Sequence, residues 1–343
     1  MKGSVFMKNE KTTNRPDESS TSYDDVFRTM ITDSSMLAAC LVNEMFSEHI
    51  SLGAKYEKYQ NEVFLADNRK RTTDSHVKFE GDKYFYHMEC ESMAGGAAIL
   101  IRLFEYDAAL ALSHHMIEGN TLHVTFPRTG VLYLRATKNT PDVMQMVVEA
   151  ESSEHPLVVD VPVMKVSSYS LEEVINRKLW FLFPFLIFNY EKGLMSKVAE
   201  RKIEAEDNAL ECIKTVMAEL DRLCTIGEID SFTKSMMMAM IHKAVINLVD
   251  NKLTKSERIR EGADEYMGGQ VLEYEAKTIL NRGIEQGIEQ GREQEREETI
   301  KAVKAMILAL KKYNGVKLDA VEAVMTEMNY SQEDAEALVS KYW

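Results

Sequence analysis

The sequence predicts a mixed α/β protein followed by a long helical region. Between residues 54 and 165, several segments alternate apolar and polar side chains, which is typical of strands. Helical patterns precede and interrupt these segments, and no strand signal follows Tyr190. Helices and strands in this order predict a sheet core flanked by helices, with an all-helical C-terminal arm behind it.

The composition excludes one class of function. The formal net charge of −14 is spread evenly along the 343 residues. A protein that coats DNA needs a basic face to displace counterions, so this class is excluded, whereas an enzyme that reaches DNA through a bound metal is not. The four cysteines form no Cys-x-x-Cys pair, which favours reduced thiols in a cytosolic protein.

No segment predicts a signal peptide or a membrane span. Residues 1–21 are polar and predict a disordered leader without an apolar core. The longest apolar run, Leu179–Phe188, is about half the length that a spanning helix needs. We therefore expect a cytoplasmic protein with no membrane partner.

Capping signals and periodicity place the elements of the first predicted domain, residues 22–190. Ser22 with Asp25 is typical of a capping box and predicts the first helix. Further helices are predicted at about 36–47, at 97–113, and after Ser170, which forms a second capping box with Glu173. The predicted strands are 56–65, 71–79, 83–92, 121–126, 131–136, 144–149 and 157–165.

The C-terminal arm divides into three predicted parts. Residues 191–282 form helices, and their methionine-rich stretch 236–240 fits either core packing or an adaptable binding surface. Residues 283–299 carry Gly-x-x-x-Gly repeats, which predict a weakly helical connector or, alternatively, tight helix packing through the glycines. Residues 300–343 form a small helical segment whose last helix begins at Ser331. The apolar stripes of this arm predict a homo-oligomer.

The turn Glu80–Lys83 predicts the register of a β-hairpin. Gly81 at the first central position suits a two-residue type II′ turn. A three-residue loop would bury Asp74 among apolar side chains, so the hydrophobic pattern favours the two-residue register. The facing pairs are then Thr72 with Glu91, Asp74 with Glu89, and His76 with His87.

Three carboxylates thus meet on one face of two adjacent strands. Close like charges raise one another's pKa values, which proteins tolerate mainly where a cation lies between them. Oxygen ligands suit Mg²⁺ or Mn²⁺, so Asp74, Glu89 and Glu91 are candidate metal ligands. A solvated polar face without a ligand is the alternative. The facing His76 and His87 suit a softer metal such as Zn²⁺, or a plain solvent-exposed surface.

Several motifs resemble the PD-(D/E)XK nuclease superfamily. Asp74, a hairpin and Glu89-Cys90-Glu91 resemble its D…(D/E)-x-K signature. The order and spacing of further motifs resemble more closely the YhgA-like family of recombination-promoting nucleases, also described as transposases, in which Gln commonly replaces the Lys. These motifs are Asp24–Arg28, Thr73–Ser75, Tyr86–Ser92, Ile101–Asp107, Val131–Arg135, Val161–Val163, Phe185–Tyr190 and the glycine repeats.

The resemblance implies a restriction-endonuclease-like fold and a Mg²⁺-dependent DNA endonuclease, with Asp74 and Glu89 as metal ligands. Glu91 stands where the superfamily has Lys and the family usually has Gln. The Lys positions the attacking water and offsets charge on the phosphate. Glu91 is instead a candidate third ligand or proton acceptor, so positive charge must come from elsewhere.

Candidate sources of that charge lie near the hairpin. Arg102 and Tyr106 lie one helical turn apart, away from the apolar stripe of the predicted helix 97–113, and are candidate phosphate contacts. Arg71, in the basic cluster Arg69-Lys70-Arg71, is a third; a plain surface role is the alternative for each. Glu44 on the preceding helix is a candidate for a water-mediated carboxylate.

Three functions of different classes fit these observations. Asp74 and Glu89 favour a metal-dependent DNA endonuclease that hydrolyses phosphodiester bonds. Glu91 and the acidic composition favour a catalytically degenerate nuclease fold that acts as an interaction or inhibitory module. The last helices, in residues 316–343, also fit a regulatory adaptor that binds a protein partner.

Overall fold

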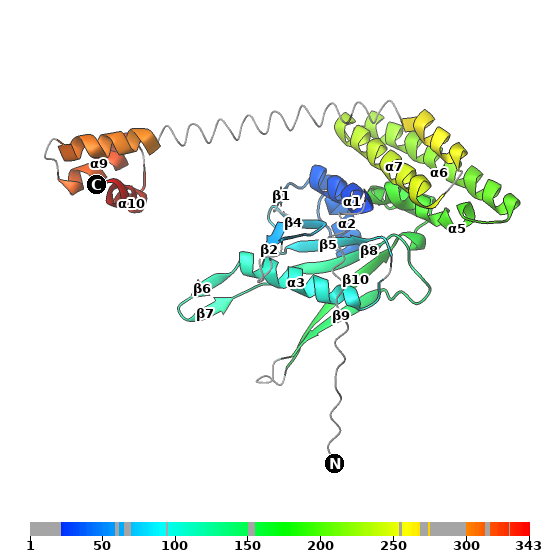
Figure 1. Cartoon of the computed structure of the whole chain (residues 1–343), viewed down its shortest axis with the longest axis horizontal. Helices are drawn as coiled ribbons and strands as arrows, with labels where there is room; N and C mark the ends of the chain where they lie inside the picture. Colours follow the sequence, from blue (N-terminus) through cyan, green and yellow to red (C-terminus); the bar gives the residue numbers. More distant parts are fainter. Residues whose placement is uncertain are drawn as a thin grey trace, which may run out of the picture. The chain divides into compact units, whose positions relative to one another are not determined.

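The structure is a computed structural model that consists of two compact units (Figure 1). The first unit ends at Tyr274 and the second begins at Glu275. The predicted leader 1–21 and the predicted connector 283–299 lie outside the described residues. The described residues are 22–58, 62–64, 70–93, 95–149, 155–253, 256–267, 274, 300–312, 316–328 and 330–343.

A six-stranded mixed sheet forms the centre of the first unit, so the predicted mixed α/β class is confirmed. β5, β8 and β10 run parallel, whereas β4 and β9 run antiparallel to their neighbours. In spatial order the strands are β1 (Tyr56–Lys58), β4 (Ser75–Phe79), β5 (Tyr86–Glu91), β8 (Arg128–Tyr133), β10 (Leu157–Lys165) and β9 (Val143–Val148). Two short ribbons pair β2 (Glu62–Phe64) with β3 (Lys70–Thr72), and β6 (Met116–Glu118) with β7 (Thr121–His123).

Helix α3 (Ala98–Ser113) covers one face of this sheet (Figure 1). Its Ile99 and Leu103 pack with Val131 of β8 and with apolar residues of β9 and β10. The apolar pattern of this helix predicts one buried stripe of Leu100, Leu103, Phe104, Leu110 and Ala111. The prediction is correct in part, because Leu103, Leu110 and Ala111 are buried while Phe104 is 40% exposed. The buried side of the helix also carries Asp107.

The opposite face of the sheet packs against α1 (Ser22–Asp33), α2 (Ser35–Phe46) and the 3₁₀ helix η2 (Trp180–Asn189). The Ser34 hydroxyl caps α2 by accepting a hydrogen bond from the Leu37 amide at 3.3 Å. Alternate residues of the central hairpin join this core, as period-two alternation requires. They are Val77, Phe79, Tyr86, Met88 and Cys90.

The helices between residues 191 and 267 share this same core. The predicted capping box of Ser170 and Glu173 begins α4 (Leu171–Asn176), which follows the short helix η1 (Val166–Ser168) and leads into η2. Next come α5 (Glu191–Leu194), α6 (Ala199–Thr225), α7 (Ser231–Lys252) and a helix at 257–267.

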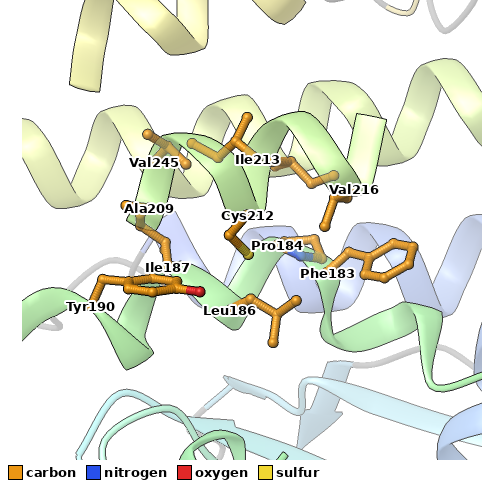
Figure 2. A pocket seen from close by; sticks show the side chains of 11 residues that line it. Phe183, Pro184, Leu186, Ile187, Tyr190, Ala209, Cys212, Ile213, Val216 and Val245 are labelled. Carbon is orange, nitrogen blue, oxygen red and sulfur yellow. The ribbon is translucent and has the colours of Figure 1, made fainter. Parts of the chain in front are cut away.

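Figure 2 shows how closely η2 and α6 are joined. Pro184 and Ile187 of η2 line one apolar pocket together with Cys212 and Val216 of α6. α7 in turn contacts both η2 and α1. The domain boundary expected near residue 190 therefore falls inside one continuous hydrophobic core.

The methionine-rich stretch lies inside that core. Met236, Met237, Met238 and Met240 are at most 6% exposed. The core-packing interpretation of this stretch is therefore confirmed, and the adaptable surface is not.

The second unit is a small helical segment, as expected. It consists of a helix at 300–312, α9 (Lys317–Met328) and α10 (Gln332–Tyr342). Ser331 caps α10 by accepting a hydrogen bond from the Asp334 amide at 3.2 Å, which confirms the predicted start. The core of this unit contains Val303, Ile307, Ala320, Val324, Ala335 and Val339. No described helix in either unit is long and apolar enough to cross a membrane.

Candidate functional site

The register of the β4–β5 hairpin agrees with the prediction. Ser75 pairs with Met88 and His76 with His87, which places Asp74, just before β4, next to Glu89. The Asp74 amide donates a hydrogen bond to Glu89 Oε1 at 3.0 Å. The predicted contact between these two residues is therefore present.

The predicted turn is wrong in type, although the register is right. Gly81 has a φ of +80° and is the second central residue of a turn in which the Asp82 amide donates to the Phe79 carbonyl at 3.0 Å. A type II turn requires positive φ at that position, which suits glycine. The strands then separate until Tyr86, because Asp82 accepts hydrogen bonds from the Tyr84 amide and the Tyr86 hydroxyl.

The predicted pairing of Thr72 with Glu91 is also wrong. Thr72 ends β3 and pairs with Glu62 of β2 in a separate ribbon. The chain bends at Asp74, so the strand predicted at 71–79 is broken there into β3 and β4.

Asp74 and Glu89 are buried carboxylates with different partners for their two oxygens. Asp74 Oδ2 accepts from the Cys90 amide at 2.9 Å, whereas Oδ1 lies 3.4 Å from a guanidinium nitrogen of Arg28. Glu89 Oε1 accepts from the Asp74 amide, whereas Oε2 lies 3.6 Å from Arg102. Each carboxylate thus has one oxygen in a short hydrogen bond and one in a longer ionic contact.

A histidine links Glu89 to helix α3. His87 Nε2 lies 3.0 Å from Glu89 Oε1, and His87 Nδ1 lies 2.7 Å from Asp107 Oδ1. Thr129 of β8 donates its hydroxyl to Asp107, 2.8 Å from both carboxylate oxygens. His87, Asp107 and Thr129 are each at most 1% exposed. The four residues form a continuous buried chain of hydrogen bonds.

The electrostatics of this cluster follow from burial and pairing. Burial by itself would lower the pKa of His87, but its hydrogen bonds to Asp107 and Glu89 raise that pKa to about 9. Burial, followed by repulsion from Glu89 and Asp24, raises the pKa of Asp74, against the opposing effects of the Cys90 amide and Arg28. The two carboxylates that contact His87 thus favour its protonated form.

Glu91 and Arg102 occupy the more exposed end of the cluster. The Glu91 side chain is 25% exposed and the Arg102 side chain 36% exposed. The Arg102 guanidinium contacts the Glu91 carboxylate directly as well as approaching Glu89. The structure therefore links Glu91 and Arg102 to the pair of Asp74 and Glu89.

Other predicted residues lie elsewhere or in other roles. Tyr106 is buried, with its ring edge-on to His87 at a centroid distance of 5.9 Å, so it lies on the inner side of α3 and not on the outer side as predicted. Glu44 pairs with Arg177 and accepts from the Tyr169 hydroxyl, and so is not a site carboxylate. The side chain of Arg71 lies outside the described residues.

The facing histidines are buried and not solvent-exposed, because α3 covers their face of the sheet. His76 is 2% exposed and His87 is fully buried. Burial, followed by repulsion from His87 and His114, lowers the pKa of His76 to about 3. The interpretation of a wet histidine surface is therefore wrong.

Sequence reasoning missed Arg28, Asp107 and Thr129 as parts of this cluster. A signal for Asp107 was present, since it lies one turn from Leu103 on the apolar stripe of α3, where an acid needs a buried partner. Arg28 gave no comparable signal, because its partner Asp74 lies 46 residues away in the sequence.

The chemistry of the donor set fits a hard divalent cation. Asp74, Glu89 and Glu91 offer carboxylate oxygens, which Mg²⁺ and Mn²⁺ prefer, and Oδ1 of Asp74 and Oε2 of Glu89 have only the longer ionic contacts. Among the described residues, however, no three His, Cys, Asp or Glu side chains converge as a ready metal site. Arg28 and Arg102 supply the neighbouring positive charge in this arrangement.

No family model matches the chain, and no curated protein or solved structure matches it either. The site is therefore interpreted from its own geometry and from the motifs in its sequence.

Proposed function

We propose that the chain is a metal-dependent DNA endonuclease of the PD-(D/E)XK type with a restriction-endonuclease-like core. The observation that carries this proposal is the hydrogen-bonded pair of Asp74 and Glu89 on neighbouring strands, in which each carboxylate keeps one oxygen out of short hydrogen bonds. A buried acidic pair of this kind is stabilised by a bound cation. Its place near the carboxyl end of β5, beside the parallel strand β8, is where open α/β sheets usually bind ligands.

In this proposal Asp74 and Glu89 hold Mg²⁺ or Mn²⁺, and Glu91 is a third ligand or an anchor for Arg102. The bound cation supplies Lewis-acid activation of the phosphodiester and of water. Arg102 contacts the phosphate, because its guanidinium is the most exposed cationic group among those that touch the carboxylates. Positive charge thus reaches the phosphate from α3 and not from residue 91.

The direct test is cleavage of plasmid DNA with Mg²⁺ or Mn²⁺. Asp74→Asn and Glu89→Gln should each lower cleavage by orders of magnitude, since both remove a ligand. Glu80→Gln is a matched control, because Glu80 is an exposed carboxylate of the same hairpin. A wild-type chain that cleaves no DNA and shows no metal-dependent change in melting temperature would overturn the proposal.

A second candidate is a catalytically degenerate nuclease fold that acts as an interaction or inhibitory module. The ion pair of Glu91 with Arg102 favours it, because a guanidinium already neutralises the carboxylate where the superfamily has Lys. This candidate predicts a native state that is insensitive to millimolar Mg²⁺ or Mn²⁺. The melting temperature with and without metal therefore separates the two functions.

A further inference from the structure

The Glu89 carboxylate is oriented by two donors on the same oxygen. Oε1 lies 3.0 Å from both the Asp74 amide and His87 Nε2. Two donors that approach one oxygen from different elements limit rotation of the whole carboxylate. Oε2 is thereby directed toward Arg102, which lies 3.6 Å away at the more exposed end of the cluster.

The His87 ring is itself held from its other side. Nδ1 contacts Asp107 of α3 at 2.7 Å, and the Tyr106 ring packs edge-on against the imidazole. Asp107 accepts the Thr129 hydroxyl of β8 at 2.8 Å. The orientation of Glu89 thus depends on contacts that lead through His87 to Asp107 on α3 and to Thr129 on β8.

This polar chain lies beside the apolar contacts between α3 and the sheet. In the turns of α3 before Asp107, Ile99 and Leu103 pack against the sheet together with Val131. A buried ionic group is often less stabilising than a well-packed apolar group of the same size, so stability alone does not account for this chain. Its last contact is made to one oxygen of a candidate metal ligand.

We infer that His87, held by Asp107 and Thr129, is a positioning residue that fixes Glu89 for a divalent cation. This inference rests on the proposed function, since it assigns the support of the proposed site. Partners that orient ligands in this way typically change metal affinity or activity by about 10- to 100-fold when they are removed. All three residues are buried, and in this proposal they act through the contact of His87 with Glu89.

Two substitutions of His87 separate positioning from folding. In His87→Gln the side-chain amide nitrogen replaces Nε2 and still donates to Glu89, but the link to Asp107 is lost. In His87→Asn the amide nitrogen replaces Nδ1 and still donates to Asp107, but Glu89 loses its donor. Both variants remove the imidazolium, so their losses in melting temperature should be similar.

The measurement is Mn²⁺ affinity by titration calorimetry on the full chain. We expect His87→Asn to weaken Mn²⁺ binding by about 10- to 100-fold, whereas His87→Gln stays close to wild type. Thr129→Val should fall between them, and Thr129→Ser, which keeps the hydroxyl, should match wild type. Equal Mn²⁺ affinity in His87→Asn and His87→Gln would overturn the inference, whatever their stability.

Failure of the proposed function is distinguishable from failure of this inference. If the wild-type chain binds no Mn²⁺, the proposed metal site is wrong. The positioning contact is then read in the metal-free protein, from the NMR signal of the His87 Nε2 proton. Glu89→Gln should shift that signal strongly, and Glu91→Gln should leave it in place. An unchanged signal in Glu89→Gln would show that His87 does not hold Glu89.

Discussion

The Arg102 guanidinium contacts the carboxylate of Glu91, which the proposed resemblance to PD-(D/E)XK nucleases aligns with their Lys. The two side chains come from adjacent elements, α3 and the last position of β5. The positive charge that is absent from residue 91 is therefore present beside it, on a helix. Substitutions at both positions can therefore move the positive charge from residue 102 on the helix to residue 91 on the strand.

Moving that charge gives the first prediction. Arg102→Ala should weaken DNA binding and reduce its dependence on salt, because one phosphate contact is lost, while Mn²⁺ affinity stays within a few fold. The double variant Glu91→Lys with Arg102→Ala restores the superfamily arrangement and should recover binding. Fluorescence anisotropy at several salt concentrations, with Ca²⁺ in place of Mg²⁺, measures both. Unchanged binding of Arg102→Ala at low salt would make Arg102 only a partner of Glu91.

Removing one buried carboxylate should affect the metal-free and metal-bound proteins differently. Burial and the neighbouring Glu89 raise the pKa of Asp74, so its charge is unfavourable in the metal-free fold. Asp74→Asn should therefore raise the melting temperature without metal, or leave it unchanged, and abolish the increase that millimolar Mn²⁺ gives. Differential scanning fluorimetry of wild type, Asp74→Asn and the control Glu80→Gln tests this. A large loss of metal-free stability in Asp74→Asn would contradict the prediction.

The stability of the chain should change with pH through His87. Its pKa rises from 6.5 to about 9 on folding, against the lowering effect of burial, so the folded state holds the proton more tightly. This contribution is fully present below pH 6.5 and is lost as the pH rises to about 9. The difference in unfolding free energy between wild type and His87→Gln should shrink over that window. Urea unfolding at several pH values measures it, and a constant difference would contradict the assignment.

His76 should act in the opposite direction. Its pKa is lowered from 6.5 to about 3 on folding, first by burial and then by His87 and His114. The unfolded chain therefore takes up a proton before the folded one does, and the stability falls as the pH drops from 6.5 to about 3. His76→Gln should lessen this acid-side loss in the same urea series. If His76→Gln lost as much stability at low pH as wild type does, His76 would be accessible to water in the folded protein.

Gly130 should tolerate no larger side chain. A Cβ at this position in β8 would overlap the Met45 side chain of α2 and lie 3.2 Å from the Phe46 ring. Overpacking of this kind typically costs about 1–3 kcal/mol, so Gly130→Ala should lower the unfolding free energy by that amount. Gly95→Ala is the control, because no atom lies within 4 Å of its added Cβ. Equal stability of the two variants would mean that Met45 moves aside freely.

The helices of residues 191–274 should be required for folding of the sheet. A chain that ends at Tyr190 exposes the side of η2 that lines a pocket with Cys212 and Val216 of α6, so we expect it to aggregate or to lack cooperative unfolding. A chain that ends at Tyr274 keeps the whole first core and should unfold cooperatively. Circular dichroism separates these outcomes.

Light scattering on the full chain and on the chain that ends at Tyr274 tests the predicted self-association of the arm. Equal monomeric masses for the two chains would exclude it.

The sequence by itself determined the local parts of this protein. Period-two alternation around Gly81 was sufficient to pair His76 with His87 and to bring Asp74 to Glu89, because a shift of one residue would have moved every apolar side chain to the wrong face. The starts of α4 and α10 were equally readable, since a capping residue acts within one turn of its own helix. These features depend on residues close together in the chain.

The tertiary structure alone decided which polar side chains became buried. α3 covers the histidine face of the hairpin, and this long-range packing turns an apparently wet surface into a dry one where His87 must pair with Asp107. It likewise places Arg28 beside Asp74 and joins the helices between residues 191 and 267 to the core of the sheet. Burial depends on elements that are distant in sequence, and the periodicity of one segment carries no information about what packs on top of it.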